Sequence, residues 1–165
     1  MKKPHSEIQV RRAECSDAAS ISALLHQAFL EYRPLYTDGG FAATAISSEQ
    51  VENRIREGPV WIALNAVAIV GTGSAIPKDE SLYIRGMAVH PAVRSSGIGK
   101  LLLRTIEEFA LASGCKKLLL TTTPFLTAAI RLYEGFGFER TTDGPHDLFG
   151  TPLFAMTKTL DRSGA

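Results

Sequence analysis

Residues 94–100 read Arg-Ser-Ser-Gly-Ile-Gly-Lys and join two segments whose apolar residues recur with different periods. The segment before this turn, 82–89, is rich in residue types that favour β-strands. The segment after it, 100–112, has apolar residues at helical spacing, and a buried-type strand follows at 117–122. Because two strands joined through a helix normally pair in parallel, this part of the chain predicts a strand, a helix and a parallel strand.

The turn itself has the composition of a phosphate-binding site. Gly97 and Gly99 carry no Cβ, so backbone N–H groups there can come close to a ligand. The helix that follows directs the positive end of its dipole at the same point. Arg94 and Lys100 add positive charge, and the two serines between Arg94 and Gly97 add hydroxyl donors. These groups suit a diphosphate, although a tight strand-to-helix connection without a ligand would use the same glycines.

Two other phosphate-binding motifs do not fit the turn. The P-loop requires a glycine at the position of Arg94 and a serine or threonine at that of Leu101. The dinucleotide-binding fingerprint requires a third glycine at Leu102 and an acidic residue roughly 20 positions later, a region that offers Lys116 and Lys117. Neither class of nucleotide site is therefore predicted.

The length of the chain predicts one domain, residues 1–165. Residues 33–45 are aromatic and contain adjacent glycines, so we expect an irregular loop over a site. Thr127 is expected to cap the last helix, and Gly135 and Gly137 to end it. The predicted fold is α/β (α+β), a single mixed, mostly antiparallel sheet of about seven strands flanked by about four helices. The expected strands are 8–12, 60–64, 66–77, 82–89, 117–122, 138–142 and 153–160, and the expected helices are 18–29, 48–56, 100–112 and 128–134.

Composition and charge exclude several classes of function. The 18 Lys and Arg residues nearly balance the 17 Asp and Glu residues, so the net charge of +1 provides no field for nucleic acid or an anionic membrane. Cys15 and Cys115 stand far apart, and no His or Cys pair has the spacing of a metal site, so we expect no metal. The longest apolar stretch, 60–70, is shorter than the roughly 20 residues that span a bilayer. We therefore expect a soluble protein in the reducing cytoplasm.

A second motif lies nearer the C-terminal end. Ala129, Leu132 and Tyr133 are followed by Gly137 and Phe138 at the spacing A-x-x-L-Y-x-x-x-G-F. With the earlier turn, whose arginine and glycines match R/Q-x-x-G-x-G/A, the sequence resembles the GNAT-type N-acetyltransferase family. Both motifs stand in the family's order, and the expected sheet accounts for nearly the whole chain.

The resemblance implies an enzyme that uses acetyl-CoA as co-substrate and moves the acetyl group to a primary amine of a small molecule or a protein by direct attack. In the family the tyrosine of the second motif protonates the departing thiolate, which assigns Tyr133 as the catalytic acid. A backbone N–H at or near Val89 is the expected oxyanion donor, beside two central strands that splay apart. The residues implied for acetyl-CoA binding are Met87, Ala88, Val89, Arg94, Ser95, Ser96, Gly97, Ile98, Gly99, Lys100, Thr127, Ala129 and Leu132. The acceptor is expected to contact Tyr32, Tyr36, Phe41, Tyr83, Arg85 and the loop at 144–150, and a homodimer is compatible with these assignments.

Two positions depart from the family pattern. Leu126 stands where the family often has an asparagine that contacts pantetheine, and the neighbouring Thr127 can take its place. Tyr83 stands where some members carry a glutamate base. These departures keep open a second hypothesis, an acyl-CoA-binding sensor or partner subunit with little turnover. The base itself stays open among Glu31, Asp79, Glu80, His146 and Asp147, or a water chain that ends at one of them.

Overall fold

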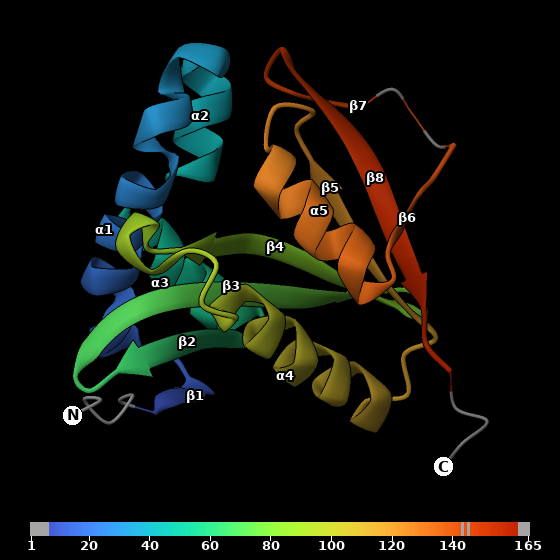
Figure 1. Cartoon of the computed structure of the whole chain (residues 1–165), viewed down its shortest axis with the longest axis horizontal. Coiled ribbons are helices and arrows are strands. Elements are labelled where there is room, and N and C mark those ends of the chain that lie inside the picture. The colour runs from blue at the N-terminus through green and yellow to red at the C-terminus, as the bar shows by residue number, and fades with distance from the viewer. Residues whose placement is uncertain (1–6, 143, 145, 162–165) are drawn as a thin grey trace.

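The computed structural model describes residues 7–142, 144 and 146–161. The strands are β1 (Ile8–Arg12), β2 (Val60–Asn65), β3 (Ala68–Lys78), β4 (Ser81–Val89), β5 (Lys117–Thr122), β6 (Glu139–Arg140), β7 (His146–Leu148) and β8 (Thr151–Thr159). Within the described residues they form one eight-stranded sheet in the order β1-β2-β3-β4-β5-β8-β6, with β7 paired to β8 (Figure 1). The β4–β5 pair is parallel, whereas the other pairs are antiparallel. The predicted mixed, mostly antiparallel sheet is confirmed.

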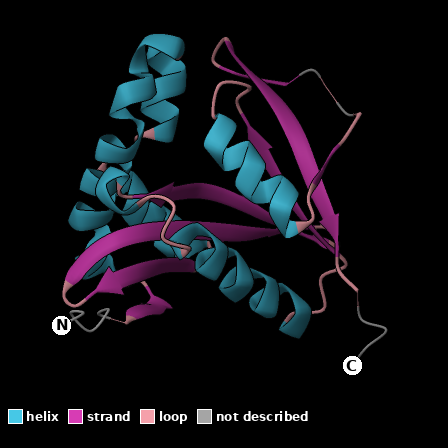
Figure 2. Cartoon of the chain, viewed as in Figure 1, coloured by secondary structure: helices cyan, strands magenta, loops and turns pink. Residues whose placement is uncertain are grey.

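Helices cover both faces of this sheet (Figure 2). The described residues form five α-helices, α1 (Ala18–Phe29), α2 (Asp38–Thr44), α3 (Ser48–Glu57), α4 (Ile98–Ala112) and α5 (Thr127–Phe136). Three short 3₁₀-helices accompany them, η1 (Cys15–Asp17), η2 (Leu30–Leu35) and η3 (Pro91–Val93). The α4 helix packs on β2, β3 and β4, while α1 packs against β3, β4 and α3.

The unbroken apolar run at the start of β2 shows why both faces are covered. Val60 and Ile62 pack into a core shared with α1 and α3. Trp61 and Ala63 point the other way, into a core shared with α4 and α5. Since successive side chains in a strand face opposite sides, a strand that is apolar at every position needs a packed layer on each side.

The central strands β4 and β5 separate soon after they begin to pair. Their parallel register covers only residues 81–83 of β4 and 117–119 of β5. The opposite edge of β5 pairs with β8 along the whole strand, residues 117–122. The edge of β4 that faces β5 is therefore unpaired from residue 84 onward, which is the splay that the resemblance implied.

A bulge in β4 lies next to this gap. Thr72 faces Ala88 in the β3–β4 register, but Ser74 faces Arg85, so β4 holds one extra residue between these two pairs. Gly86 takes up the distortion with a φ of +67°, a conformation that favours glycine. The bulge re-aims the side chains on either side of it.

The prediction of an irregular loop at 33–45 is wrong, because these residues form the end of η2 and the whole of α2. Thr37 caps α2 by accepting a hydrogen bond from the Gly40 N–H at 2.9 Å. Gly40 is needed for packing rather than for a turn, since a Cβ there would lie 2.2 Å from Oγ1 of Thr151. This contact with β8, far along the chain, is what a local pattern cannot reveal.

Other boundaries differ less. Leu126, not Thr127, occupies the N-cap position of α5, and Gly135 lies inside the helix that Gly137 ends. The strand expected at 138–142 is reduced to β6, and β7 is additional, which gives eight strands and five helices in place of about seven and four. In the part of the chain described, none of the helices has both the length and the apolar character needed to cross a membrane.

Candidate active site

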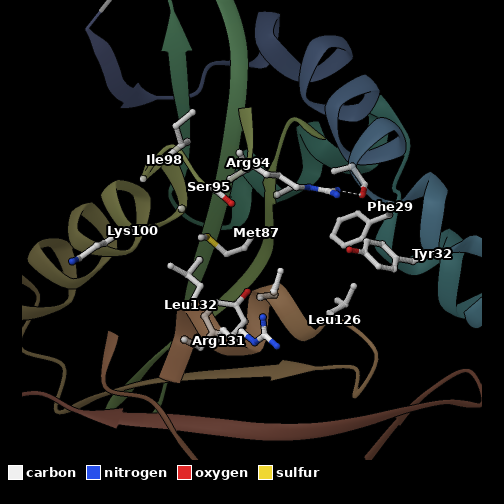
Figure 3. Close-up of a pocket in the computed structure, with 18 residues that line it drawn as sticks. Phe29, Tyr32, Met87, Arg94, Ser95, Ile98, Lys100, Leu126, Arg131 and Leu132 are labelled. Carbon is white, nitrogen blue, oxygen red and sulfur yellow. Dashed lines mark hydrogen bonds between the residues drawn. The ribbon is translucent and has the colours of Figure 1, made fainter. Parts of the chain in front are cut away.

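A cavity of about 510 Å³ opens beside the unpaired end of β4 (Figure 3). Its walls come from the end of α1, the start of η2, the end of β4, the turn at 94–100 and α5. The sequence-predicted residues that line it are Tyr32, Met87, Ala88, Val89, Arg94, Ser95, Gly97, Ile98, Gly99, Lys100, Ala129, Leu132 and Tyr133. Two motifs about 35 residues apart in the sequence thus meet in one cavity, as expected for the resemblance.

Several predicted residues lie outside this cavity. The Ser96 hydroxyl donates to the Val93 carbonyl, which holds the turn together. Tyr36 and Phe41 are 8% and 7% exposed and pack with Phe125 in an aromatic cluster. Thr127 does not line the cavity either.

On β4, Tyr83 and Arg85 also lie outside the cavity. The Tyr83 hydroxyl lies 2.9 Å from Oγ1 of Thr121 on β5, and the Arg85 guanidinium pairs with Glu57 on α3. Within the predicted loop at 144–150, residue 145 is outside the described residues, and the others do not line the cavity.

The two glycines of the turn have different tasks. Gly97 has a φ of +88°, and a Cβ built there would meet no atom within 4 Å. A Cβ on Gly99 would lie only 2.7 Å from Cδ2 of Leu132 on α5. Gly99 therefore allows α4 and α5 to approach each other, while Gly97 leaves the backbone at the helix start open to a ligand.

Arg94 points away from the backbone of its own turn and toward α1. Its Nη2 donates to the Ala28 carbonyl at 2.7 Å (Figure 3). Its Nη1 pairs with the Glu31 carboxylate. The guanidinium also lies 5.9 Å from the centre of the Tyr32 ring. Arg94 thus fastens the turn to the opposite wall of the cavity.

Two other cations line the cavity, Lys100 on α4 and Arg131 on α5. Arg131 was missed from the sequence because an arginine on an amphipathic helix is usually a solvated residue. Phe29, three residues before Tyr32, also lines the cavity and was missed for the opposite reason, since its apolar spacing indicates helix packing. The signal that could have found Arg131 is its place inside the second motif, directly before Leu132.

Tyr133 is 8% exposed and reaches the cavity from the last turns of α5. Burial, with a smaller contribution from the nearby Tyr36, raises the pKa of Tyr133 to about 12. The phenol is therefore neutral and carries its proton throughout the physiological pH range. Its ring packs against that of Phe138, with centroids 5.8 Å apart.

No aspartate, glutamate or histidine belongs to the cavity wall in the described part of the chain. Of the proposed bases, Glu31 pairs with Arg94, and Glu80 pairs with Lys116 at 3.0 Å. Asp147 accepts from the Gly150 N–H in the β7–β8 turn. The other two, Asp79 and His146, lie in the β3–β4 turn and in the exposed strand β7. The described residues also hold no group of three or more metal-binding side chains.

The buried phenols predict sensitivity to alkali. Tyr133, with a pKa of about 12, resists ionisation in the folded state, and burial also raises the pKa of Tyr36. In the unfolded chain both ionise near pH 10. The contribution of these neutral phenols to the free energy of unfolding is therefore fully present below about pH 10, and it is lost as the pH rises through about 12. The free energy of unfolding in urea should fall between pH 8 and pH 11.5. In Tyr133→Phe this fall should be smaller than in the wild type by up to about 2–3 kcal/mol. An equal loss in both proteins would contradict the burial of this hydroxyl.

Comparisons with known proteins agree with the geometry. The sequence profile described as the Acetyltransferase (GNAT) family matches residues 22–138. N-acetyltransferase 8B of Rattus norvegicus is 34% identical over 87 residues, which are 49% of this chain and 39% of that protein. The uncharacterized N-acetyltransferase YjgM of Escherichia coli (strain K12) is 29% identical over 143 residues, 82% of this chain and 84% of that protein. The chain therefore matches about two fifths of the first relative and most of the second.

A solved structure has the same fold. The PaiA N-acetyltransferase from Thermoplasma acidophilum, in complex with coenzyme A, superposes with a TM-score of 0.79 at 17% identity, over 93% of this chain and 99% of that one. The profile covers more than half of the chain and includes both the turn at 94–100 and Tyr133. The chain belongs to the GNAT acetyltransferase family.

Proposed function

We propose that this protein is an acetyl-CoA-dependent N-acetyltransferase that acts on a primary amine by direct attack. The observation that carries the proposal is the single cavity that joins the open Gly97 turn, two cations and the neutral phenol of Tyr133. Gly97 leaves room for a diphosphate at the start of α4, and Lys100 and Arg131 supply charge for phosphate oxygens. Family membership supports the same donor.

The unpaired edge of β4 suits the amide-bearing arm of the donor. The His90 N–H donates to the Val70 carbonyl on β3. Because successive N–H groups of a strand point to opposite edges, the Val89 N–H is directed toward the gap. It is therefore the group that we assign to stabilise the oxyanion of the thioester.

The reaction needs one proton donor and one proton acceptor. The amine nitrogen forms a bond to the thioester carbon, the carbon–sulfur bond breaks, and the thiolate takes the proton of Tyr133. Water removes the proton of the substituted ammonium, because no carboxylate or imidazole of the described residues lines the cavity. Tyr133 then regains a proton from solvent.

The acceptor is an amine of a small molecule or a peptide. Phe29 and Tyr32 form an aromatic part of the wall, which suits an acceptor with an apolar body. Neither Cys15 nor Cys115 forms a disulfide in the described part of the chain, and this, with an intracellular acetyl donor, favours the cytoplasm as the place of the reaction. A homodimer stays a prediction.

The test is the release of free CoA from acetyl-CoA in the presence of a library of amines and peptides. We expect repeated turnover with at least one acceptor, and mass spectrometry should find that acceptor heavier by one acetyl group. Acetyl-CoA binding without turnover on any acceptor would favour the sensor hypothesis. Absence of acetyl-CoA binding would overturn both.

A further inference from the structure

Two arginines converge on the face of β4 that is turned away from α4 and α5. Arg85 extends from β4 itself, and Arg54 reaches across from α3. A Cβ built on Gly86 would lie 2.7 Å from Nη1 of Arg54, so this guanidinium rests directly on the β4 bulge. The glycine thus makes room for a cation.

This pair of cations has too few anions around it. Glu57 is bound to Arg85, with 2.5 Å between its Oε2 and Nη2. Within the described residues the Arg54 guanidinium forms no hydrogen bond or ion pair, and Nε of Arg85 is buried without a partner. Burial, and after it the charge of Arg85, lowers the pKa of Arg54 to about 10, although the charge of Glu57 acts in the opposite direction. One carboxylate thus serves two guanidinium groups.

A surplus of partly buried positive charge is costly unless an anion joins it. A carboxylate is the best match, because its two oxygens accept from a guanidinium in a planar, paired geometry. Such an anion would have donors ready on Arg54 and on the Nε of Arg85.

The position of Arg54 and Arg85 along β4 links them to the reaction. Gly86 is followed directly by Met87 and Ala88, which line the donor cavity. At about 3.3 Å per residue, the bulge lies within roughly 10 Å of Val89 along the strand. The Tyr83 hydroxyl reaches Thr121 across the strands at the point where β4 and β5 stop pairing. Arg54 and Arg85 therefore lie on the α3 side of β4, a few residues along the strand from the end that lines the donor cavity.

We propose that Arg54 and Arg85 bind a carboxylate of the acceptor, so that the substrate is a primary amine that also carries a carboxylate. This inference rests on the proposed acetyl transfer. The donor cavity supports it, since its ionisable wall residues in the described ranges are three cations and two tyrosines, a poor environment for a polycationic amine.

Matched acceptors test the proposal. Phenylalanine is compared with 2-phenylethylamine, and 6-aminohexanoate with pentylamine, so that each pair differs by a carboxylate and the two pairs differ in its distance from the amine. For at least one pair we expect kcat/KM to be 10-fold or more higher for the acid. Arg85→Gln should lower kcat/KM for that acid roughly 10- to 100-fold, as for a lost charge-assisted hydrogen bond, and leave the plain amine nearly unchanged.

A second charge-removing variant and a control variant complete the test. Arg54→Met retains the packed stem and removes the charge, so it should act like Arg85→Gln. Arg56→Gln on the same helix is the control, because the Arg56 side chain is 63% exposed and should matter for neither acceptor. An equal fall for acid and amine in Arg85→Gln, or a wild-type enzyme that prefers neither acid, would overturn the carboxylate site.

A binding measurement separates this inference from the acetyl transfer itself. Titration of each acid into the protein saturated with CoA, followed by calorimetry, should show binding that Arg85→Gln weakens. Such binding without any turnover would sink the proposed activity and leave the carboxylate site standing. Turnover of plain amines with no effect of Arg85→Gln on either acid would overturn the carboxylate site and leave the proposed activity standing. No binding of either acid, with no turnover of either, would overturn the site.

Discussion

Tyr133→Phe is expected to lower turnover about 10²-fold or more while acetyl-CoA affinity stays close to that of the wild type. The ring lies in the cavity wall and packs against Phe138, and phenylalanine preserves that packing. What the variant loses is the proton that the departing thiolate needs. Because burial keeps the pKa of the phenol at about 12, this proton is present at every pH at which the enzyme is assayed.

Turnover should be measured by CoA release with the best acceptor, and affinity by calorimetry with acetyl-CoA. If the variant keeps full turnover, the thiolate takes its proton from water or from the substituted ammonium, and Tyr133 is a packing residue. If acetyl-CoA affinity falls together with turnover, the hydroxyl positions the donor instead. The melting temperature of the variant shows whether either change reflects a damaged fold.

Gly97→Asp is expected to weaken acetyl-CoA binding by 10²-fold or more. The new carboxylate would stand at the start of α4, where the helix dipole and the open backbone favour the diphosphate, and would repel it. A Cβ there meets no protein atom within 4 Å, so the loss of stability should be confined to the strain of the positive φ, about 1 kcal/mol, and the loss of affinity should exceed it. The measurement is the dissociation constant of CoA beside the urea unfolding free energy.

The fold offers a matched control at the other end of α4. Gly114 has a φ of +82°, close to the +88° of Gly97, and a Cβ there also meets nothing within 4 Å. Gly114→Asp therefore imposes the same backbone strain away from the cavity and should leave CoA affinity unchanged. Gly97→Ala adds the strain without the charge. Equal affinities for Gly97→Asp and Gly114→Asp would remove the diphosphate from this turn.

The sequence predicts the centre of the sheet better than its periphery. The strand expected at 82–89 is observed as Ser81–Val89, and the helix expected at 100–112 as Ile98–Ala112. Both carry strong, local apolar patterns. Gly39 and Gly40 hide the helix α2 from sequence-based prediction. Gly40 is required because the helix passes close to Thr151, more than a hundred positions later in the chain.

The residues of the candidate site also differ in how well the sequence predicts them. The turn at 94–100 and Tyr133 were found because each belongs to a short contiguous motif, and the cavity brings them together. The aromatic character of Tyr36 and Phe41 predicts acceptor contacts, yet both pack with Phe125 behind the cavity wall and do not line the cavity. Whether an aromatic residue lines a cavity or fills a core depends on partners distant in the sequence, and no local pattern contains them.

The attachment of Arg94 to Ala28 and Glu31 has a thermodynamic consequence for the two substrates. One structural unit carries both the turn that we assign to the donor and, through η2, the aromatic wall that we assign to the acceptor. A donor that shifts the turn would also change the contacts of Arg94 with Ala28 and Glu31, and with them the position of the acceptor wall. Linkage then requires reciprocity, so that the factor by which the donor changes the acceptor's affinity equals the factor by which the acceptor changes the donor's.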